Sequence, residues 1–178
     1  MIKRPLLLAA ALSALLFATP GSAALQQGAV APQISTQGAL DGRAFNFNLR
    51  EALRQGPVVV YFFPKAFTPG CNAEAQAFAS QIDDFKKAGA QVIGLSGDNL
   101  DDLKQFSVKE CAGKFAVATA TPATIRAYDV NLQRNGADTG LTTRTSYVIA
   151  RDGRIVMVHS DMNYAEHVSR TLAAVKAL

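Results

Sequence analysis

The sequence contains few of the side chains on which metal and cofactor sites depend. It has two cysteines, two histidines and no tryptophan in 178 residues. His159 and His167 are neither near a cysteine in the sequence nor at ligand spacing, so a zinc site has no ligand set. We therefore expect no metal and no cofactor, and a core or surface role for both histidines.

An excess of charge of one sign is also missing, which argues against a protein that binds phosphates. The formal net charge is +4, and two of the positive charges, Lys3 and Arg4, lie in a segment that we expect to be removed. Neither a basic run nor a glycine-rich phosphate loop occurs, so a nucleic-acid or nucleotide partner has no support. Glycine and proline usage is ordinary and 49% of the residues are hydrophobic, as expected for one packed domain.

The one long apolar run is too short to span a membrane. It covers residues 5–17, follows two basic residues and precedes a cluster of small residues that ends at Ala24. This order is typical of a cleaved secretory signal peptide, since a membrane-spanning helix needs ~20 apolar residues. We expect residues 1–24 to be removed and residues 25–178 to be exported without a membrane anchor, to the periplasm if the source is bacterial. An uncleaved interfacial anchor is the alternative.

Buried strands and amphipathic helices alternate through the first part of the remaining chain. The β-branched and aromatic run that starts at Pro57 lacks alternation, which is typical of a central strand covered on both faces. The next apolar residues recur at helical spacing until Gly89, and Asp98 or Asn99 can cap a second helix. The predicted elements are a strand over 57–63, a helix over 70–87, a strand over 91–95 and a helix from about 100 to 113.

The second part of the chain predicts a hairpin and a final helix. Residues 145–150 and 154–159 are strands joined by Asp152-Gly153, a strong two-residue turn signal. Asn163 and Glu166 have capping-box spacing before the last amphipathic segment. Residues 131–143 are polar and irregular, and we predict a loop there. The whole pattern indicates an α/β fold with a mixed sheet and no second domain.

Cys71 stands in the first turn of the helix that follows the central strand. Free backbone N–H groups and the positive end of the helix dipole favour a thiolate at such a position. Thr68, three residues earlier, can place a hydroxyl beside the sulfur, while Pro64 and Pro69 stiffen the approach. A buried, inert cysteine in an ordinary strand-to-helix turn explains the same residues equally well.

A resemblance distinguishes between these interpretations. Pro64-x-x-x-Thr68-x-x-Cys71 resembles the active-site signature of the peroxiredoxins, which are thiol peroxidases with a thioredoxin-like fold. Residues 63–74 are most similar to the bacterioferritin-comigratory, or Q-type, branch of this alkyl hydroperoxide reductase/thiol-specific antioxidant superfamily. Ala31-Pro32 resembles the entry segment of that branch. Residues 144–153 resemble its arginine-led strand and hairpin.

The resemblance implies a role for each residue of the motif. Cys71 would be the peroxidatic nucleophile that becomes a sulfenic acid. Thr68 would hydrogen-bond the peroxide and the sulfur, and Pro64 would shield the site from water. Arg144 would favour the thiolate and stabilise charge on the leaving oxygen, and Glu74 would orient Arg144. Without the resemblance, Arg144 would be an exposed strand residue and Glu74 a solvated helix position.

The second thiol departs from the pattern of many Q-type relatives. Those relatives carry a resolving cysteine five residues after the first, where this chain has Gln76. Cys111 is the only other thiol, and some members of the branch resemble this arrangement and form an intramolecular disulfide between two helices. We expect Cys111 to resolve the sulfenic acid. A simply buried Cys111 and a permanent structural Cys71–Cys111 bridge remain open.

The expected partners follow from this chemistry. They are a peroxide substrate and a thioredoxin-like thiol reductant, itself exported or membrane-linked, and the protein would be a monomer or weak dimer. The alternative function is an exported thiol–disulfide oxidoreductase of the same fold. Such enzymes resemble thioredoxin and use two cysteines separated by two residues, whereas Glu74 occupies the second position here.

Overall fold

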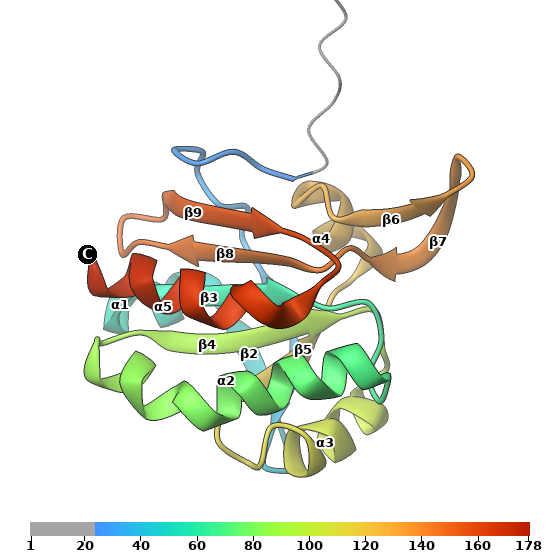
Figure 1. Ribbon diagram of the computed structural model, residues 1–178, viewed down its shortest axis with the longest axis horizontal. Helices are drawn as coiled ribbons and strands as arrows, with labels where there is room; N and C mark the ends of the chain where they lie inside the picture. Colours follow the sequence, from blue (N-terminus) through green and yellow to red (C-terminus); the bar gives the residue numbers. More distant parts are fainter. Residues whose placement is uncertain (1–23) are drawn as a thin grey trace, which may run out of the picture.

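A mixed seven-stranded sheet forms the centre of the molecule in the computed structural model, which describes residues 24–178 (Figure 1). The strand order is β2-β1-β5-β4-β3-β8-β9, with β3, β4 and β5 parallel and the remaining neighbours antiparallel. The strands of this sheet are β1 (Ser35–Leu40), β2 (Arg43–Asn48), β3 (Val58–Phe62), β4 (Gln91–Ser96), β5 (Ala116–Thr119), β8 (Thr145–Ile149) and β9 (Ile155–Ser160). All of the predicted signal peptide except Ala24 lies outside the described residues.

Helices cover both faces of the sheet. The helices are α1 (Leu49–Gln55), α2 (Pro69–Lys87), α3 (Leu100–Lys109), α4 (Pro122–Ala127), the 3₁₀ turn η1 (Tyr164–Glu166) and α5 (His167–Lys176). The cluster of buried residues on one face includes α2, α3 and α5, and that on the other includes α1 and α4. In Figure 1, α2 and α5 lie side by side in front of the sheet.

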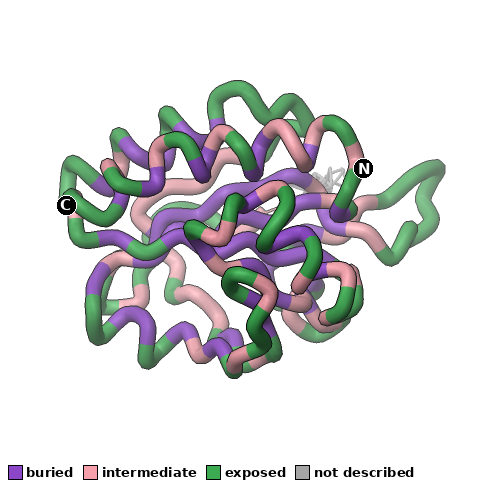
Figure 2. Tube along the Cα trace, turned by 90° about the horizontal axis from the view of Figure 1, so that it is seen from below, coloured by how far each residue is buried: buried purple, intermediate pink, exposed green. Residues whose placement is uncertain are grey.

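The side chains of strand β3 contribute to both apolar clusters. Every residue from Val58 to Phe62 is buried, and alternate side chains enter opposite clusters. Tyr61 leans over Gly94 of β4, where a Cβ atom would lie 2.6 Å from the tyrosine ring, so only glycine fits there. Figure 2 shows the strands as a buried centre between helices that expose their outer faces.

Most elements predicted from the sequence are present. The central strand, the helix after it, the second strand and the Asp152-Gly153 hairpin all lie where the patterns put them, within one or two residues. The second helix ends earlier than predicted, at Lys109, and Asn99 rather than Asp98 is its N-cap, since its side chain accepts from the N–H of Asp102.

The predicted loop over residues 131–143 is wrong. This segment forms a two-stranded hairpin, β6 (Asn131–Arg134) and β7 (Ala137–Thr142), which projects from the body of the molecule (Figure 1). Asn135 and Gly136 make its turn with φ of 52° and 77°, the left-handed values that an Asn-Gly hairpin turn requires. The turn signal was in the sequence, but the flanking strands are exposed and polar, so they lack the alternation that marks a half-buried strand.

The start of the last helix also differs from its prediction. Asn163 caps the short η1 turn by accepting from the N–H of Ala165, and α5 begins only at His167. Glu166 does not close a capping box and instead pairs with Arg170. As a result, His167 is the first residue of α5, and its side chain is buried.

Candidate active site

Cys71 lies at the amino end of α2, directly beyond the carboxyl end of β3. Thr68 is the N-cap of the helix and Pro69 its first residue, so Cys71 is in the first turn. The first backbone N–H groups of a helix lack helical partners, and the positive end of the helix dipole lies here. The side chain is only 2% exposed. The predicted position of Cys71 at a helix start is therefore confirmed.

Arg144 contacts this sulfur from the start of β8, the strand next to β3. Because Thr145 pairs with Phe62, Arg144 stands immediately before β8 at the same end of β3. Its Nη2 donates to the Cys71 sulfur at 3.6 Å, and its Nη1 donates to Oε2 of Glu74 in a buried ion pair. Its Nε donates to the carbonyl oxygen of Met162 at 2.9 Å, which fixes the plane of the guanidinium. Arg144 is thus buried rather than an exposed strand residue.

Burial and charge oppose each other at this pair. Burial alone would lower the pKa of Arg144. The neighbouring Glu74 carboxyl and Cys71 sulfur raise it by more than burial lowers it, so the net shift is upward and the guanidinium stays charged. Burial raises the pKa of Glu74 from 4.5 to about 7, although Arg144 pulls it down. The carboxyl beside Arg144 therefore keeps a proton to higher pH than an exposed glutamate does.

The loop between β3 and α2 is held by a buried carboxylate that sequence reasoning considered only as a helix cap. Oδ2 of Asp98 accepts from the backbone N–H of Ala66 at 2.7 Å and from the Ser96 hydroxyl at 2.8 Å. Lys65 lies 3.6 Å from the other oxygen. These contacts fix the loop from Pro64 to Thr68 on which the signature residues stand.

Thr68 and Pro64 both stand in this loop, each half-buried. The Thr68 hydroxyl donates to the carbonyl oxygen of Lys65 at 2.9 Å. Its single proton is therefore engaged, while its lone pairs remain able to accept a hydrogen bond. Phe67 beside it has a φ of 62°, a strained value for a non-glycine residue, and its ring lies edge-on to Phe106.

Cys111 follows α3 and is fully buried in the same apolar cluster as Cys71, and both cysteines are free thiols in this structure. Burial, and then the charge of Glu110, raises the pKa of the Cys111 thiol. The nearby Tyr61 hydroxyl is buried without a hydrogen-bond partner, and burial raises its pKa too. While it is buried in this way, Cys111 is a poor nucleophile, because burial disfavours its ionised form.

His167 is the site residue that sequence reasoning missed. Its ring is buried, with Nδ1 3.7 Å from Oε1 of Glu74. A histidine at the start of an amphipathic helix gives no sequence signal of such a contact, because the contact depends on how α5 packs against α2.

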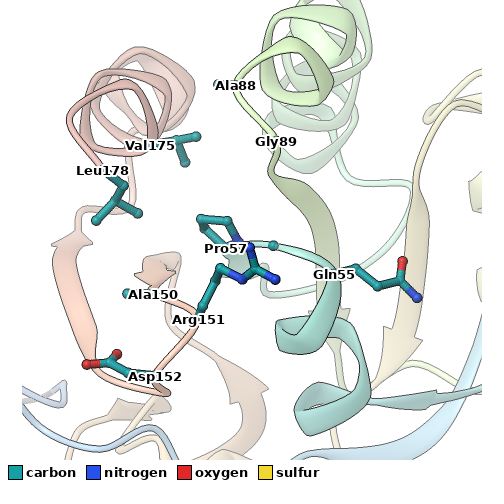
Figure 3. A pocket seen from close by; sticks show the side chains of 10 residues that line it. Gln55, Pro57, Ala88, Gly89, Ala150, Arg151, Asp152, Val175 and Leu178 are labelled. Atoms are coloured by element: carbon teal, nitrogen blue, oxygen red, sulfur yellow. The ribbon is translucent and has the colours of Figure 1, made fainter.

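A pocket of about 520 Å³ lies at the opposite end of the sheet. Figure 3 shows it between the turns that precede β3 and β4, the β8–β9 turn and the end of α5, with the Pro57, Arg151 and Leu178 side chains around it. The lining residues do not include Cys71, Thr68, Glu74 or Arg144. Within residues 24–178, no three side chains of the metal-binding types gather at one place. No helix of this region has the length and apolar character needed to cross a bilayer.

Comparison with known proteins decides the family. The sequence profile of the AhpC/TSA family matches residues 27–158. The chain belongs to the AhpC/TSA family. Peroxiredoxin Bcp of Escherichia coli is 31% identical over 145 residues, which are 80% of this chain and 90% of that protein. Peroxiredoxin Bcp of Xanthomonas campestris is 32% identical over 122 residues, 67% of this chain and 76% of that protein.

Solved AhpC/TSA structures show the same architecture. A structure of Xanthomonas campestris bacterioferritin comigratory protein, described in terms of alkyl peroxide reduction activity, superimposes with a TM-score of 0.70 at 30% identity. It covers 79% of this chain and 90% of its own. Mycobacterium tuberculosis BcpB, at 24% identity and a TM-score of 0.75, shares the fold over 86% of this chain and 98% of its own.

Membership confirms the predicted thioredoxin-like fold and the predicted activity. The protein is a peroxiredoxin, a thiol-dependent peroxidase whose reaction takes a peroxide and a thiol reductant. The relatives favour this activity over the alternative of a thiol–disulfide oxidoreductase.

Proposed function

We propose that Cys71 is the peroxidatic nucleophile and that Arg144 activates it. The observation that carries this assignment is the contact of 3.6 Å between Nη2 of Arg144 and the Cys71 sulfur, at the amino end of α2. A guanidinium and free N–H groups together favour the thiolate, and both are in place before substrate arrives.

The reaction at Cys71 is a displacement on oxygen. The thiolate attacks one peroxide oxygen, the O–O bond breaks with its electron pair going to the departing oxygen, and Cys71 becomes a sulfenic acid. The departing alkoxide or hydroxide takes up a proton and leaves as alcohol or water. Arg144 stabilises the negative charge that moves onto this oxygen in the transition state. Hydrogen peroxide and organic hydroperoxides both fit this scheme.

Thr68, Pro64 and Glu74 support the reaction. Thr68 stands three residues before Cys71, and its hydroxyl, already donating to the Lys65 carbonyl, accepts the O–H of the incoming peroxide. Pro64 keeps water from the sulfur and leaves no N–H to be satisfied there. Glu74 orients Arg144 through their buried ion pair.

Cys111 resolves the sulfenic acid. Its sulfur attacks the Cys71 sulfur, the S–O bond breaks, water leaves and an intramolecular disulfide forms. This step needs local opening of the first turn of α2 and of the residues after α3, because a disulfide holds its sulfurs about 2 Å apart. Opening also exposes Cys111 to solvent, which removes the burial that disfavours its thiolate. A thiol protein then restores both thiols by exchange.

The compartment and assembly state belong to the same proposal. Residues 1–24 direct export and are removed, and the enzyme works in the periplasm as a monomer or weak dimer. Its reductant is then an exported or membrane-linked thioredoxin-like protein, since a cytosolic one has no access. The charge and hydropathy order of the first residues supports this location.

Peptide mapping after one equivalent of peroxide, without reductant, tests the thiol scheme. The wild-type protein should lose two thiols and give a Cys71–Cys111 linked peptide. Cys111→Ser should stop at the sulfenic acid or go on to the sulfinic acid, and Cys71→Ser should consume no peroxide. Peroxide consumption by Cys71→Ser would refute the assignment of the nucleophile. A sulfinic Cys71 beside a free Cys111 in the wild type would refute resolution within the chain.

A further inference from the structure

His167 is buried beside the Glu74–Arg144 ion pair and is held on two sides. Its Nε2 lies 2.9 Å from the backbone carbonyl oxygen of Asp161, and its Nδ1 lies 2.8 Å from the hydroxyl of Ser146 on β8. Ser146 and His167 are both fully buried. A contact at each ring nitrogen, one from β8 and one from the residue after β9, therefore fixes the orientation of the imidazole.

These contacts determine where the histidine proton lies. A carbonyl oxygen can only accept, so Nε2 carries a hydrogen and donates to Asp161. In the neutral ring, Nδ1 is then an acceptor, and the Ser146 hydroxyl donates to it. Oε1 of Glu74 lies 3.7 Å from Nδ1, which is beyond hydrogen-bond distance.

The carboxyl of Glu74 has only one of its two oxygens hydrogen-bonded. Its Oε2 accepts from Arg144, whereas Oε1 is buried and has no hydrogen-bond partner. An unpartnered buried carboxylate oxygen that faces a nitrogen lone pair is unfavourable, because both groups are acceptors. A proton on Oε1 lessens this repulsion, because it removes the negative charge that the acceptor nitrogen faces.

The charged and titratable groups around His167 come from several elements. Arg144 approaches from the start of β8, and Asp161 and His159 from the end of β9, with the His159 ring centroid 4.6 Å from that of His167. Burial lowers the pKa of His167 from 6.5 to about 4; Asp161 raises it to a smaller extent, and His159 and Arg144 lower it further. The imidazole is thus neutral at the pH at which Glu74, with a pKa of about 7, still holds its proton.

We propose that His167 is a positioning residue of the peroxidase: its acceptor nitrogen Nδ1 favours a proton on Oε1 of Glu74 and so sets the charge of the carboxyl that pairs with Arg144. The inference rests on the proposed roles of Cys71 and Arg144. When Oε1 carries its proton, the carboxyl is neutral and more of the positive potential of Arg144 acts on the Cys71 sulfur. When the proton leaves for solvent, the carboxylate competes with the sulfur for the guanidinium.

Two substitutions should move the titration of Glu74 in opposite directions. In His167→Gln, the side-chain amide can donate to Oε1, which stabilises the carboxylate, so the midpoint should fall by about one pH unit. In Ser146→Ala, Nδ1 loses its competing donor and accepts only from Oε1, so the protonated carboxyl is favoured and the midpoint should rise. His159→Gln removes the neighbouring imidazole without touching Glu74 and should leave the midpoint unchanged.

Carbon NMR of the reduced protein with ¹³C-labelled glutamate measures these midpoints directly. The chain has four glutamates, and Glu74→Gln assigns the signal. The second-order rate constant with hydrogen peroxide, followed from pH 5 to 9, should show an inflection that shifts with the NMR midpoint in each variant. Circular dichroism and thermal unfolding establish that each variant is folded, and Ser146→Ala, the smaller change, keeps the test open if His167→Gln is unstable.

The result that would overturn the inference is distinct from one that would overturn the proposed function. If Ser146→Ala and a folded His167→Gln both titrate like the wild type, the histidine has only a structural role, and Cys71 and Arg144 keep theirs. If the midpoints shift as expected while the rate profile does not, the proton is held by His167 but does not act on the sulfur, which also contradicts the proposal. Failure of the proposed function would instead appear as peroxide consumption by Cys71→Ser.

Discussion

At the residue scale, two sources of positive potential meet at one sulfur. The free N–H groups of the first turn of α2 follow directly from the local sequence around Cys71. The guanidinium of Arg144 comes from 73 positions further along the chain and is held by Glu74 and by a backbone carbonyl. Because the site is buried, these charges are screened less than they would be in water, so each has a large effect.

Replacement of Arg144 by Gln should therefore slow the reaction of the reduced protein with peroxide by about 10²–10³-fold, as loss of a transition-state donor commonly does. Stopped-flow measurement of the second-order rate constant checks this. Arg170→Gln is the matched control, since Arg170 is an exposed arginine on α5 that pairs with Glu166. A fall of less than about threefold in Arg144→Gln would show that the contact with the sulfur does not assist the transition state.

Glu74 should make a pH-dependent contribution to stability. Its pKa rises from 4.5 to about 7 on folding because of burial, so the folded state binds the proton more tightly. The stabilising contribution is therefore complete below pH 4.5 and is lost as the pH rises through about 7. His167 has the opposite sign, since its pKa falls to about 4, and its contribution is lost as the pH decreases.

Comparison of wild type with Glu74→Gln emphasises the carboxyl, because the titratable groups that do not contact Glu74 cancel in the difference. The free energy of unfolding of the variant, relative to the wild type, should increase by about 3 kcal/mol between pH 4.5 and 7. Urea unfolding at a series of pH values measures this difference. A constant difference across the range would mean that Glu74 is ionised in the folded state throughout.

At the scale of elements, the proposed resolution by Cys111 involves local opening of α2 and of the residues after α3. The amide of Gln76 on α2 donates to Oε2 of Glu110, the residue before Cys111, at 2.8 Å. Gln76 is the position at which many Q-type relatives have their resolving cysteine, so this chain has a link between the two helices there. This hydrogen bond stabilises the arrangement in which both thiols are buried by about 1 kcal/mol relative to the opened one.

Gln76→Ala should accordingly speed formation of the intramolecular disulfide by about fivefold, because opening costs less. The first reaction of Cys71 with peroxide should not change, since Gln76 does not contact the sulfur or Arg144. Rapid quenching followed by mass analysis separates the two steps. Gln105→Ala, at an exposed position of α3, serves as the control and should change neither step.

At the scale of the whole molecule, the candidate active site lies at one end of the sheet, and the apolar clusters lie on its two faces. Cys71, Arg144, Glu74 and His167 gather at the carboxyl end of β3, and two apolar clusters fill the space on either face. The described chain begins beside the second cluster, where the backbone N–H of Leu25 donates to the Tyr147 hydroxyl. Leu25 thus lies at the start of the packed part that the structure describes.

Expression of the full chain in a bacterium should therefore yield a periplasmic protein whose first residue is Ala24 or Leu25. N-terminal sequencing and fractionation check this expectation. A chain that starts at Leu25 should stay in the cytoplasm and unfold at the same temperature as the exported one. Retention of residues 1–24 on the membrane would indicate an uncleaved interfacial anchor.

The sequence alone determined the elements whose signal is local. The buried strand before Cys71, the helix after it and the Asp152-Gly153 hairpin were predictable because turn residues and apolar spacing act within a few positions. The signature from Pro64 to Cys71 and its resemblance also identified Arg144 and Glu74. The exposed β6–β7 hairpin was missed, since its strands bury too little to show a pattern.

Only the tertiary structure decided which distant groups touch. The contact of His167 with Glu74, the bracing of the active-site loop by Asp98 and the link from Gln76 to Glu110 all join residues on separate elements. Their geometry depends on how α5 and α3 pack against α2 and the sheet. Spacing along the chain carries no information about such contacts, because packing brings together side chains that the sequence keeps apart.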